Sequence, residues 1–168
     1  TQWYPKPAVF DKNGWNYFSY LDKGEYYSEF GSFDVTITLP ENYVVAGSGE
    51  LINGESEIAW LESKAKETIA ISDFSKDLDI PASAATMKTL RYKQDSIHDF
   101  AWFADKRWHV LKGEVELPIS KRKVTTWSFF TNAEAEWWRK APDYISNGIR
   151  YMSNWVGEYP YSSCTAVD

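Results

Sequence analysis

The sequence has little of what disulfides, metal sites and membrane spans require. Its 168 residues include one cysteine, Cys164, and two histidines, His98 and His109. A single cysteine excludes a disulfide within the chain. Neither H-E-x-x-H nor C-x-x-C, two common zinc-ligand spacings, occurs. No apolar run approaches the roughly 20 residues that a membrane-spanning helix needs. We therefore expect no disulfide, no metal site and no membrane span in these residues.

Basic residues are too few and too scattered for a nucleic-acid-binding protein. The chain has 18 Lys and Arg against 24 Asp and Glu, which gives a net charge of −6. Binding to phosphates needs a concentrated positive face, whereas the one basic run here is the triplet 121–123. Because this triplet directly precedes the strand-like segment 124–130, we interpret it as a solvated hairpin turn. We expect no nucleic-acid partner.

Catalytic arrangements are missing as well. Nucleophilic triads, glycine-rich phosphate loops and paired catalytic carboxylates give no specific signal. His98 and Asp99 are neighbours on a predicted strand, so their side chains point to opposite faces and form no dyad. Residues 11–14 copy the opening of a calcium-binding loop without its later ligands, which favours an ordinary turn. By its own residues the chain does not look like a complete enzyme, and we assign no catalytic residue.

Aromatic residues are abundant. They make up 17% of the chain, with nine Trp and eleven Tyr. Such a composition indicates either a heavily aromatic core or an aromatic ligand face. An aromatic ligand face would suit either of two alternative functions. One is a carbohydrate-binding β-sandwich whose exposed rings, such as Trp15 and Tyr17, stack on sugars. The other is a protein-interaction domain with an aromatic patch.

Alternation of apolar and polar residues predicts a mainly β fold. Residues 33–39 alternate without error, and Pro40 ends the strand. Asn53 and Gly54 predict a type I′ turn into a strand around 58–60. Further strands are expected at 43–52, 67–71, 86–93, 97–104, 108–111, 114–117 and 124–130. Because the connections are short, we expect an antiparallel β-sandwich or saddle-like sheet followed by a C-terminal helical segment.

The pattern becomes helical at Asn132, which we expect to cap a helix that Pro142 restarts. One apolar stripe along this helix is expected to face the core. It comprises Ile145, Ile149, Met152 and Val156. Gly157 is a natural C-terminal cap, and a short strand follows near the end of the chain.

Both ends of the sequence suggest a fragment of a longer protein. The chain begins at Thr1 without an initiator Met, and it stops at Asp168 within the predicted last strand. We expect this strand, 164–167, to lack neighbours within the chain and to be frayed or borrowed by another molecule.

Four segments resemble the M1 family of zinc aminopeptidases, the gluzincins of the leukotriene A4 hydrolase and aminopeptidase N type. They match in order along the whole chain. They are Thr1-Gln2, F-D-V-T-I-T-L-P at 33–40 followed by Y-V-V-A-G-S-G at 43–49, I-H-D-F-A-W-F-A at 97–104, and G-E-Y-P-Y at 157–161. The third resembles the version in bacterial members, which favours the bacterial cell envelope or periplasm. The single cysteine fits either an envelope protein or a reducing compartment.

The resemblance implies that residues 1–131 are the later part of an N-terminal β domain and that 132–168 begin the catalytic domain. The parent would bind zinc through H-E-x-x-H and a later Glu, none of which is present here, so no cofactor is expected in this part. The parent would hydrolyse N-terminal residues from peptide substrates, and this non-catalytic part would wall the substrate cleft. Gln2 is the one functional position that the resemblance transfers, as a ligand of the substrate's N-terminal residue. Amide oxygens have the chemistry to accept hydrogen bonds from an α-ammonium group.

Overall fold

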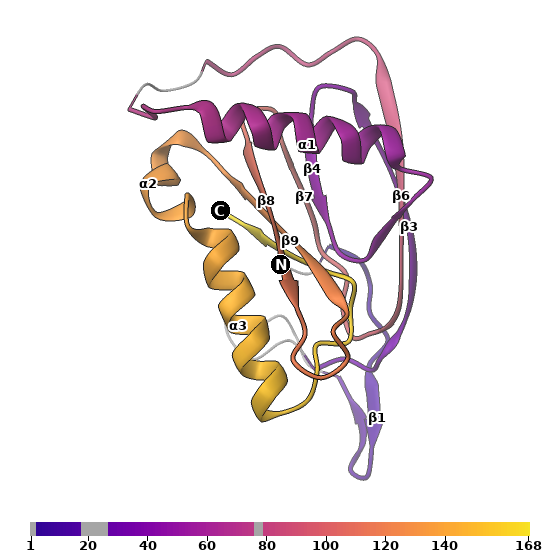
Figure 1. Cartoon of the computed structure of the whole chain (residues 1–168). Coiled ribbons are helices and arrows are strands. Elements are labelled where there is room, and N and C mark those ends of the chain that lie inside the picture. Colours follow the sequence, from indigo (N-terminus) through magenta and orange to yellow (C-terminus); the bar gives the residue numbers. More distant parts are fainter. Residues whose placement is uncertain (1–2, 18–26, 76–78) are drawn as a thin grey trace.

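The computed structural model of the chain describes residues 3–17, 27–75 and 79–168. In these residues the fold is mainly β, with small, largely antiparallel sheets and three α-helices, of which α3 lies near the C-terminus (Figure 1). This confirms the predicted mainly β fold with a C-terminal helical segment.

The first three-stranded sheet confirms the alternation at 33–39. Strand β3 (Gly31–Pro40) pairs antiparallel with β6 (Met87–Ile97), whose other edge pairs with β5 (Glu50–Ile52). The inward-facing residues of this sheet form a hydrophobic cluster that is closed by β4 (Val44–Gly47) and β7 (Trp102–Asp105). Its buried members are Ile37, Leu39, Val45, Leu90, Tyr92 and Phe100.

Helix α1 (Glu55–Ala70) replaces two predicted strands, so the strands expected at 58–60 and 67–71 are wrong. Leu61, Ala65 and Thr68 are buried at steps of four and three residues, which is the period of one helix face. Gly54 is required by a close approach rather than by a hairpin. A β-carbon at this position would lie 2.2 Å from the side chain of Leu51.

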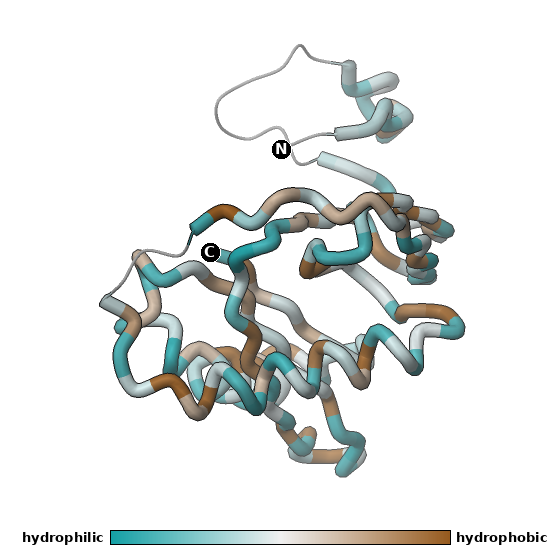
Figure 2. The backbone as a smooth tube through the Cα atoms, turned by 90° about the horizontal axis from the view of Figure 1, so that it is seen from above, coloured by the Kyte–Doolittle hydropathy of each residue, from teal (hydrophilic) through white to brown (hydrophobic). Residues whose placement is uncertain are grey.

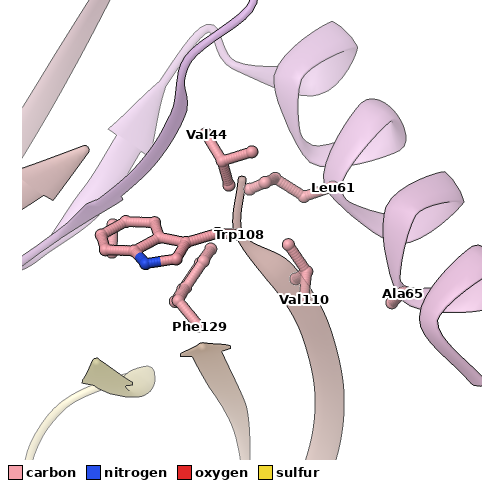
Figure 3. Packing of buried hydrophobic residues seen from close by; sticks show 7 residues of the cluster. Val44, Leu61, Ala65, Trp108, Val110 and Phe129 are labelled. Carbon is pink, nitrogen blue, oxygen red and sulfur yellow. The ribbon is translucent and has the colours of Figure 1, made fainter. Parts of the chain in front are cut away.

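Helix α1 covers a second cluster, in which its apolar side chains face β4 and the strands β8 (His109–Glu116) and β9 (Lys123–Phe130). Figure 3 shows Leu61 and Ala65 of α1 directed toward this cluster. The other members are Val44, Ala46, Trp108, Val110 and Phe129. Because Val45 belongs to the first cluster, β4 is buried on both faces and connects the two cores.

The second three-stranded sheet has the order β10-β9-β8, and β10 is the segment Ser163–Val167. β8 and β9 are antiparallel and joined by a turn that contains Lys121, which confirms the hairpin turn predicted for the basic triplet. β10 pairs parallel to β9 from Ser163↔Thr125 to Val167↔Phe129. The expectation that the last strand lacks a neighbour is therefore wrong. The connecting segment contains a helix, as a parallel crossover requires.

Other predicted boundaries also shift. The strand expected at 97–104 is interrupted, because β6 ends at Ile97 and β7 begins only at Trp102. His98 and Asp99 thus lie in a loop. The strands expected at 108–111 and 114–117 form the single strand β8.

The helical part begins with a 3₁₀ turn, η1 (Asn132–Glu134), and the short helix α2 (Ala135–Trp138). The predicted Asn132 cap is wrong, since Thr131 holds the cap position and Asn132 contacts His109 instead. Helix α3 (Ala141–Trp155) begins with Pro142 in its first turn, as predicted. Gly157 has a φ of 126° directly after it, which fits the predicted cap.

Only half of the predicted stripe of α3 faces the core. Ile149 is buried and Ile145 packs beside it against β8 and β9. Met152 and Val156, by contrast, are exposed. In this last part of the helix the buried residue is Ser153, whose hydroxyl accepts a hydrogen bond from the Tyr159 backbone N–H at 3.1 Å. The last turn of α3 therefore contacts the segment that follows the helix rather than the sheet.

A small hairpin of β1 (Val9–Asp11) and β2 (Gly14–Asn16) projects from the body (Figure 1). Among the described residues no helix is long and apolar enough to cross a membrane. Figure 2 shows hydrophobic residues in short stretches separated by hydrophilic ones.

Candidate functional site

The N-terminal segment is anchored to the loop between β6 and β7. The Trp3 indole N–H donates a hydrogen bond to the Phe100 carbonyl at 2.7 Å. The Tyr4 hydroxyl donates to the Asp99 carboxylate at 2.8 Å, and the Lys6 ammonium lies 3.3 Å from its other oxygen. These contacts join residues more than 90 positions apart in the sequence.

The Asp99 carboxylate is held in its ionised form. Partial burial alone would raise its pKa, but hydrogen bonds from Tyr4 and the Phe100 N–H, together with Lys6, outweigh burial and lower the pKa. Burial and the neighbouring Asp99 carboxylate raise the pKa of Tyr4 to about 12. At neutral pH the cluster is therefore a carboxylate that three groups of the chain bind, which suits anchoring.

Aromatic rings surround this anchor. Trp3 packs edge-on against Phe100 and Trp102, each with ring centroids 6.4 Å apart. Tyr4 packs against Phe33 at 5.6 Å, and Phe33 stacks on Phe100 at 5.8 Å. Such pairs each add stability beyond their buried area. The N-terminal segment is thus bound through its side chains.

A pocket of about 270 Å³ opens beside the anchor. Its walls include Tyr4, Lys6, Phe33 and His98, and His98 also packs against the ring of Phe30 at 5.6 Å. The pocket combines apolar ring surface with the Lys6 ammonium, which bonds Ser28 and Asp99, and with Glu29. It is a candidate place for a peptide side chain, because small-ligand pockets pair apolar walls with a few polar groups.

A second region, which we name the crease, is where three of the motif segments meet. It comprises 47–49, 96–101 and 159–162. Ser48 and Ala101 bond reciprocally: the Ser48 N–H donates to the Ala101 carbonyl at 2.9 Å, and the Ala101 N–H donates to the Ser48 hydroxyl at 3.1 Å. The Tyr161 hydroxyl donates to the Ser96 carbonyl at 2.8 Å, and the Ser162 hydroxyl donates to Glu50 at 2.8 Å.

Two glycines make the crease possible. A β-carbon at Gly47 would lie 3.1 Å from the ring of Tyr92. Gly49 has a φ of 80°, and a β-carbon there would lie 2.5 Å from the carbonyl oxygen of Lys93. The A-G-S-G motif is therefore explained by the close approach of its backbone to β6.

The segment after α3 is fixed to the turn between β8 and β9. The Glu158 carboxylate accepts hydrogen bonds from the backbone N–H groups of Ile119 and Ser120, at 2.6 and 2.8 Å. Hydrogen bonding with Ser120 is the largest cause of its lowered pKa. The Arg122 guanidinium donates to the carbonyls of Tyr159 and Tyr161. Every polar residue of the G-E-Y-P-Y segment thus has an internal partner.

Beside the crease lies a cavity of about 360 Å³. It lies between α1, β5 and the sheet β10-β9-β8. Apolar side chains such as Leu61 and Trp127 form part of its lining, together with Glu50 and Lys112. Lys112 is engaged by Glu62 at 2.6 Å and Glu50 by Ser162. Since both charged groups have partners within the chain, we read this cavity as part of the joint between the two sheets.

The predicted site residue Gln2 lies outside the described residues. Trp3, the next residue in the sequence, is the first one described. The residues of the anchor, Tyr4, Lys6 and Asp99, were missed by the sequence analysis. The available signal was the adjacent W-Y-P-K segment, but nothing in it points to a partner nearly a hundred residues away.

The described residues do not fit a zinc site. Residues 3–17, 27–75 and 79–168 contain no group of three or more His, Cys, Asp or Glu arranged to hold a metal ion. His98 packs on Phe30, and His109 contacts Asn132 and the ring of Phe74. Both histidines therefore have partners among the described residues.

The hairpin carries an exposed aromatic surface. The rings of Phe10 and Trp15 pack edge to face with centroids 5.0 Å apart. Trp15 is 64% exposed and Tyr17 85% exposed. The aromatic content is therefore divided between the core and the surface.

Comparison with known proteins gives a structural likeness only. No protein-family profile and no curated protein matches the sequence. The fold is similar to an M1 zinc metallopeptidase from Deinococcus radiodurans, with a TM-score of 0.53 and 14% identity over 83% of this chain and 26% of that one. It is also similar to a variant of a two-domain M1 zinc metallopeptidase bound to L-tryptophan, with a TM-score of 0.54, 14% identity and the same coverage. The chain thus has the fold of about a quarter of these metallopeptidases.

Proposed function

We propose that this chain is the later part of the N-terminal β domain and the start of the catalytic domain of an M1-type zinc aminopeptidase. The parent protein removes N-terminal residues from peptides. The observation that carries the proposal is the likeness of fold to M1 zinc metallopeptidases. Contacts in the crease support it, because Ser48 and Ala101 of two motif segments bond each other, and Tyr161 of a third bonds Ser96, which directly precedes the segment 97–104.

In this proposal the chain forms a wall of the substrate cleft. The anchor on Asp99 fixes Trp3 and Tyr4, the residues that directly follow Gln2. An amide oxygen at Gln2 binds the α-ammonium group of the peptide, and the adjacent aromatic pocket takes a side chain. The chain supplies position and shape, while zinc and its ligands belong to the rest of the parent.

The test uses the full natural protein. Its sequence beyond Asp168 should contain H-E-x-x-H and a later Glu. Gln2→Ala should lower kcat/KM for aminoacyl-nitroanilides about 10- to 100-fold, since a hydrogen bond to a charged group contributes about 1.5–3 kcal/mol. Gln94→Ala is the matched control, because Gln94 bonds only its neighbour Asp95 among the contacts described, and it should leave kcat/KM unchanged. The 168-residue chain alone should hold no stoichiometric zinc and show no peptidase activity.

Two results would refute this function. One is a natural protein without the zinc-binding motif. The other is a full protein that contains the motif and zinc but releases no N-terminal residues. An unchanged kcat/KM for Gln2→Ala would refute the role of Gln2 alone.

A second candidate function is carbohydrate binding, which the exposure of Trp15 and Tyr17 on the hairpin favours. Exposed aromatic faces stack on sugar rings. Titration with a panel of oligosaccharides, followed by Trp fluorescence, should then show binding that Trp15→Ala abolishes. Trp137→Ala, at a ring that is 70% exposed but lies on another element, is the control. A panel without any binding would eliminate this candidate.

A further inference from the structure

Helix α3 carries a second aromatic face that nothing in the described chain covers. Tyr144, Tyr151 and Trp155 are 64%, 60% and 76% exposed. Their spacing with Gly148, at steps of four, three and four residues, places these four residues on one side of the helix. We name this surface the outer α3 face: Tyr144, Gly148, Tyr151 and Trp155.

The outer α3 face lies beside the side that packs on the sheet. The core side is formed by Ala141, Ile145 and Ile149. At 100° per residue, the centre of the outer α3 face lies about 90° from the centre of the core side around the helix axis. The side opposite the core is polar and carries Asp143, Asn147, Arg150 and Asn154. A surface helix usually buries its whole apolar stripe, but the stripe of α3 is wider than the part that packs on the sheet.

The shape of the face suits a second helix. The position of Gly148 is open, because a β-carbon there would meet no atom outside the helix within 4 Å. This leaves a recess between Tyr144 and Tyr151, one turn to either side, into which a side chain of an opposing helix fits. A small residue between larger ones allows close packing of two helices, because ridges of one insert into grooves of the other.

Two polar side chains next to the outer α3 face bond within the helix. Arg150 donates to the Asn147 side chain at 3.3 Å, and Asn154 donates to the Arg150 carbonyl at 3.0 Å. Tyr151 and Trp155 pack on each other with ring centroids 5.9 Å apart. Tyr and Trp side chains are enriched in the central part of protein interfaces, which polar groups surround.

We propose that the outer α3 face is the docking surface for a helix from the remainder of the longer protein. This rests on the proposed function, in which the chain is part of an M1-type protein. The occupant follows from size, since this chain corresponds to only 26% of the similar metallopeptidases. The remaining three quarters of such a protein is the nearest available source of a covering helix, because it is covalently linked and therefore present at high effective concentration.

The first experiment compares oxidation rates of exposed rings by hydroxyl-radical footprinting of the full natural protein. Trp155 and Trp15 are both largely exposed here, so they form a matched pair. If the face is covered, Trp155 should react roughly tenfold more slowly than Trp15, since an interface excludes water from its centre. Equal rates for the two residues would overturn the proposal.

The second experiment uses Gly148→Ala in the full protein. Alanine favours an exposed helix more than glycine does, so an uncovered face predicts a higher melting temperature. A covered face predicts the opposite, because the methyl group fills the recess that the partner occupies. A raised melting temperature would therefore contradict docking.

Sedimentation at several concentrations tests the main competing occupant, a second copy. A dimer whose dissociation restores the oxidation of Trp155 would overturn the assignment to the same protein. These readouts are separate from the proposed function. A full protein with no aminopeptidase activity but a protected Trp155 would refute the function alone, whereas an active enzyme with an unprotected Trp155 would refute the docking alone.

Discussion

The crease and the outer α3 face use the same residue types for opposite purposes. In the crease, Tyr161 bonds a backbone carbonyl and Gly49 is forced against β6. On α3, Tyr151 is exposed and Gly148 has open space around it. In the crease, the polar groups described above bond other groups of the chain. The outer α3 face has the composition of an interface, but no described residue covers it. The difference shows that residue type alone does not reveal which surface is available for binding.

The largest effect should come from the aromatic residue at the centre of the joint. Phe100 is 1% exposed, and Phe100→Ala should lower the free energy of unfolding by about 3–5 kcal/mol because it leaves a cavity. The matched control is Phe10→Ala on the hairpin, where the ring is 61% exposed and little stability should be lost. Urea denaturation of both variants measures the contrast. Equal losses would mean that the hairpin belongs to the cooperative core.

Replacing Gly49 or Gly148 by alanine should change the stability of the 168-residue chain in opposite directions. Gly49→Ala should destabilise by about 2–4 kcal/mol, since it adds a positive-φ penalty to a clash with the Lys93 carbonyl. Gly148→Ala should stabilise by about 1 kcal/mol through helix propensity. Thermal unfolding followed by circular dichroism tests both. A stable Gly49→Ala variant would show that the crease can open without cost.

Removing the hydroxyl groups of Tyr161 and Tyr151 should give a smaller difference in stability. Tyr161→Phe removes one hydrogen bond to Ser96 and should cost about 0.5–1.5 kcal/mol. Tyr151→Phe removes a hydroxyl at an exposed ring and should change the free energy of unfolding by less than about 0.5 kcal/mol. Chemical denaturation of the two variants in parallel is sufficient. A larger loss for Tyr151→Phe would reverse the comparison.

The smallest effect concerns pH. The folded pKa of Asp99 is lowered, so the folded state binds this proton less readily than the unfolded state. Its stabilisation is present above the unfolded Asp pKa of about 3.9 and is lost as the pH falls through the folded pKa. The stability difference between wild type and Asp99→Asn should therefore shrink as the pH is lowered from about 6 to about 2. A difference that does not vary with pH would show that the carboxylate charge has no part in the anchor.

Local patterns predicted the parts of the fold that local sequence determines. Apolar and polar residues alternate at 33–39. These residues lie in β3, a strand at the edge of its sheet with one face turned to the core, so pattern and structure agree. The helix α1 was missed because Ile58 and Trp60 resemble the start of an alternating strand. Leu61, Ala65 and Thr68, spaced at four and three residues, carried the correct helical signal over a longer window.

The candidate site depends on contacts that no local pattern contains. Asp99 was predicted to lie on a strand next to His98 without pairing with it, yet its side chain has the partners Tyr4 and Lys6, more than 90 residues earlier in the sequence. Likewise the exposure of Met152 could not be read from its place on an apolar stripe, because the stripe extends beyond the residues that pack on the sheet. Such pairings are set by topology, which one sequence alone does not specify.

The joins between distant segments also constrain how the molecule is made. Trp3 can form its hydrogen bond only after Phe100 has been synthesised. Glu50 can form its own only after Ser162, which is 112 residues later. During synthesis, the aromatic segment around Trp3 therefore emerges from the ribosome well before its partners. Long sequence separations slow folding, and unpaired apolar segments are prone to association in the meantime. This segment reaches its folded position only after residues 99 and 100 have been made.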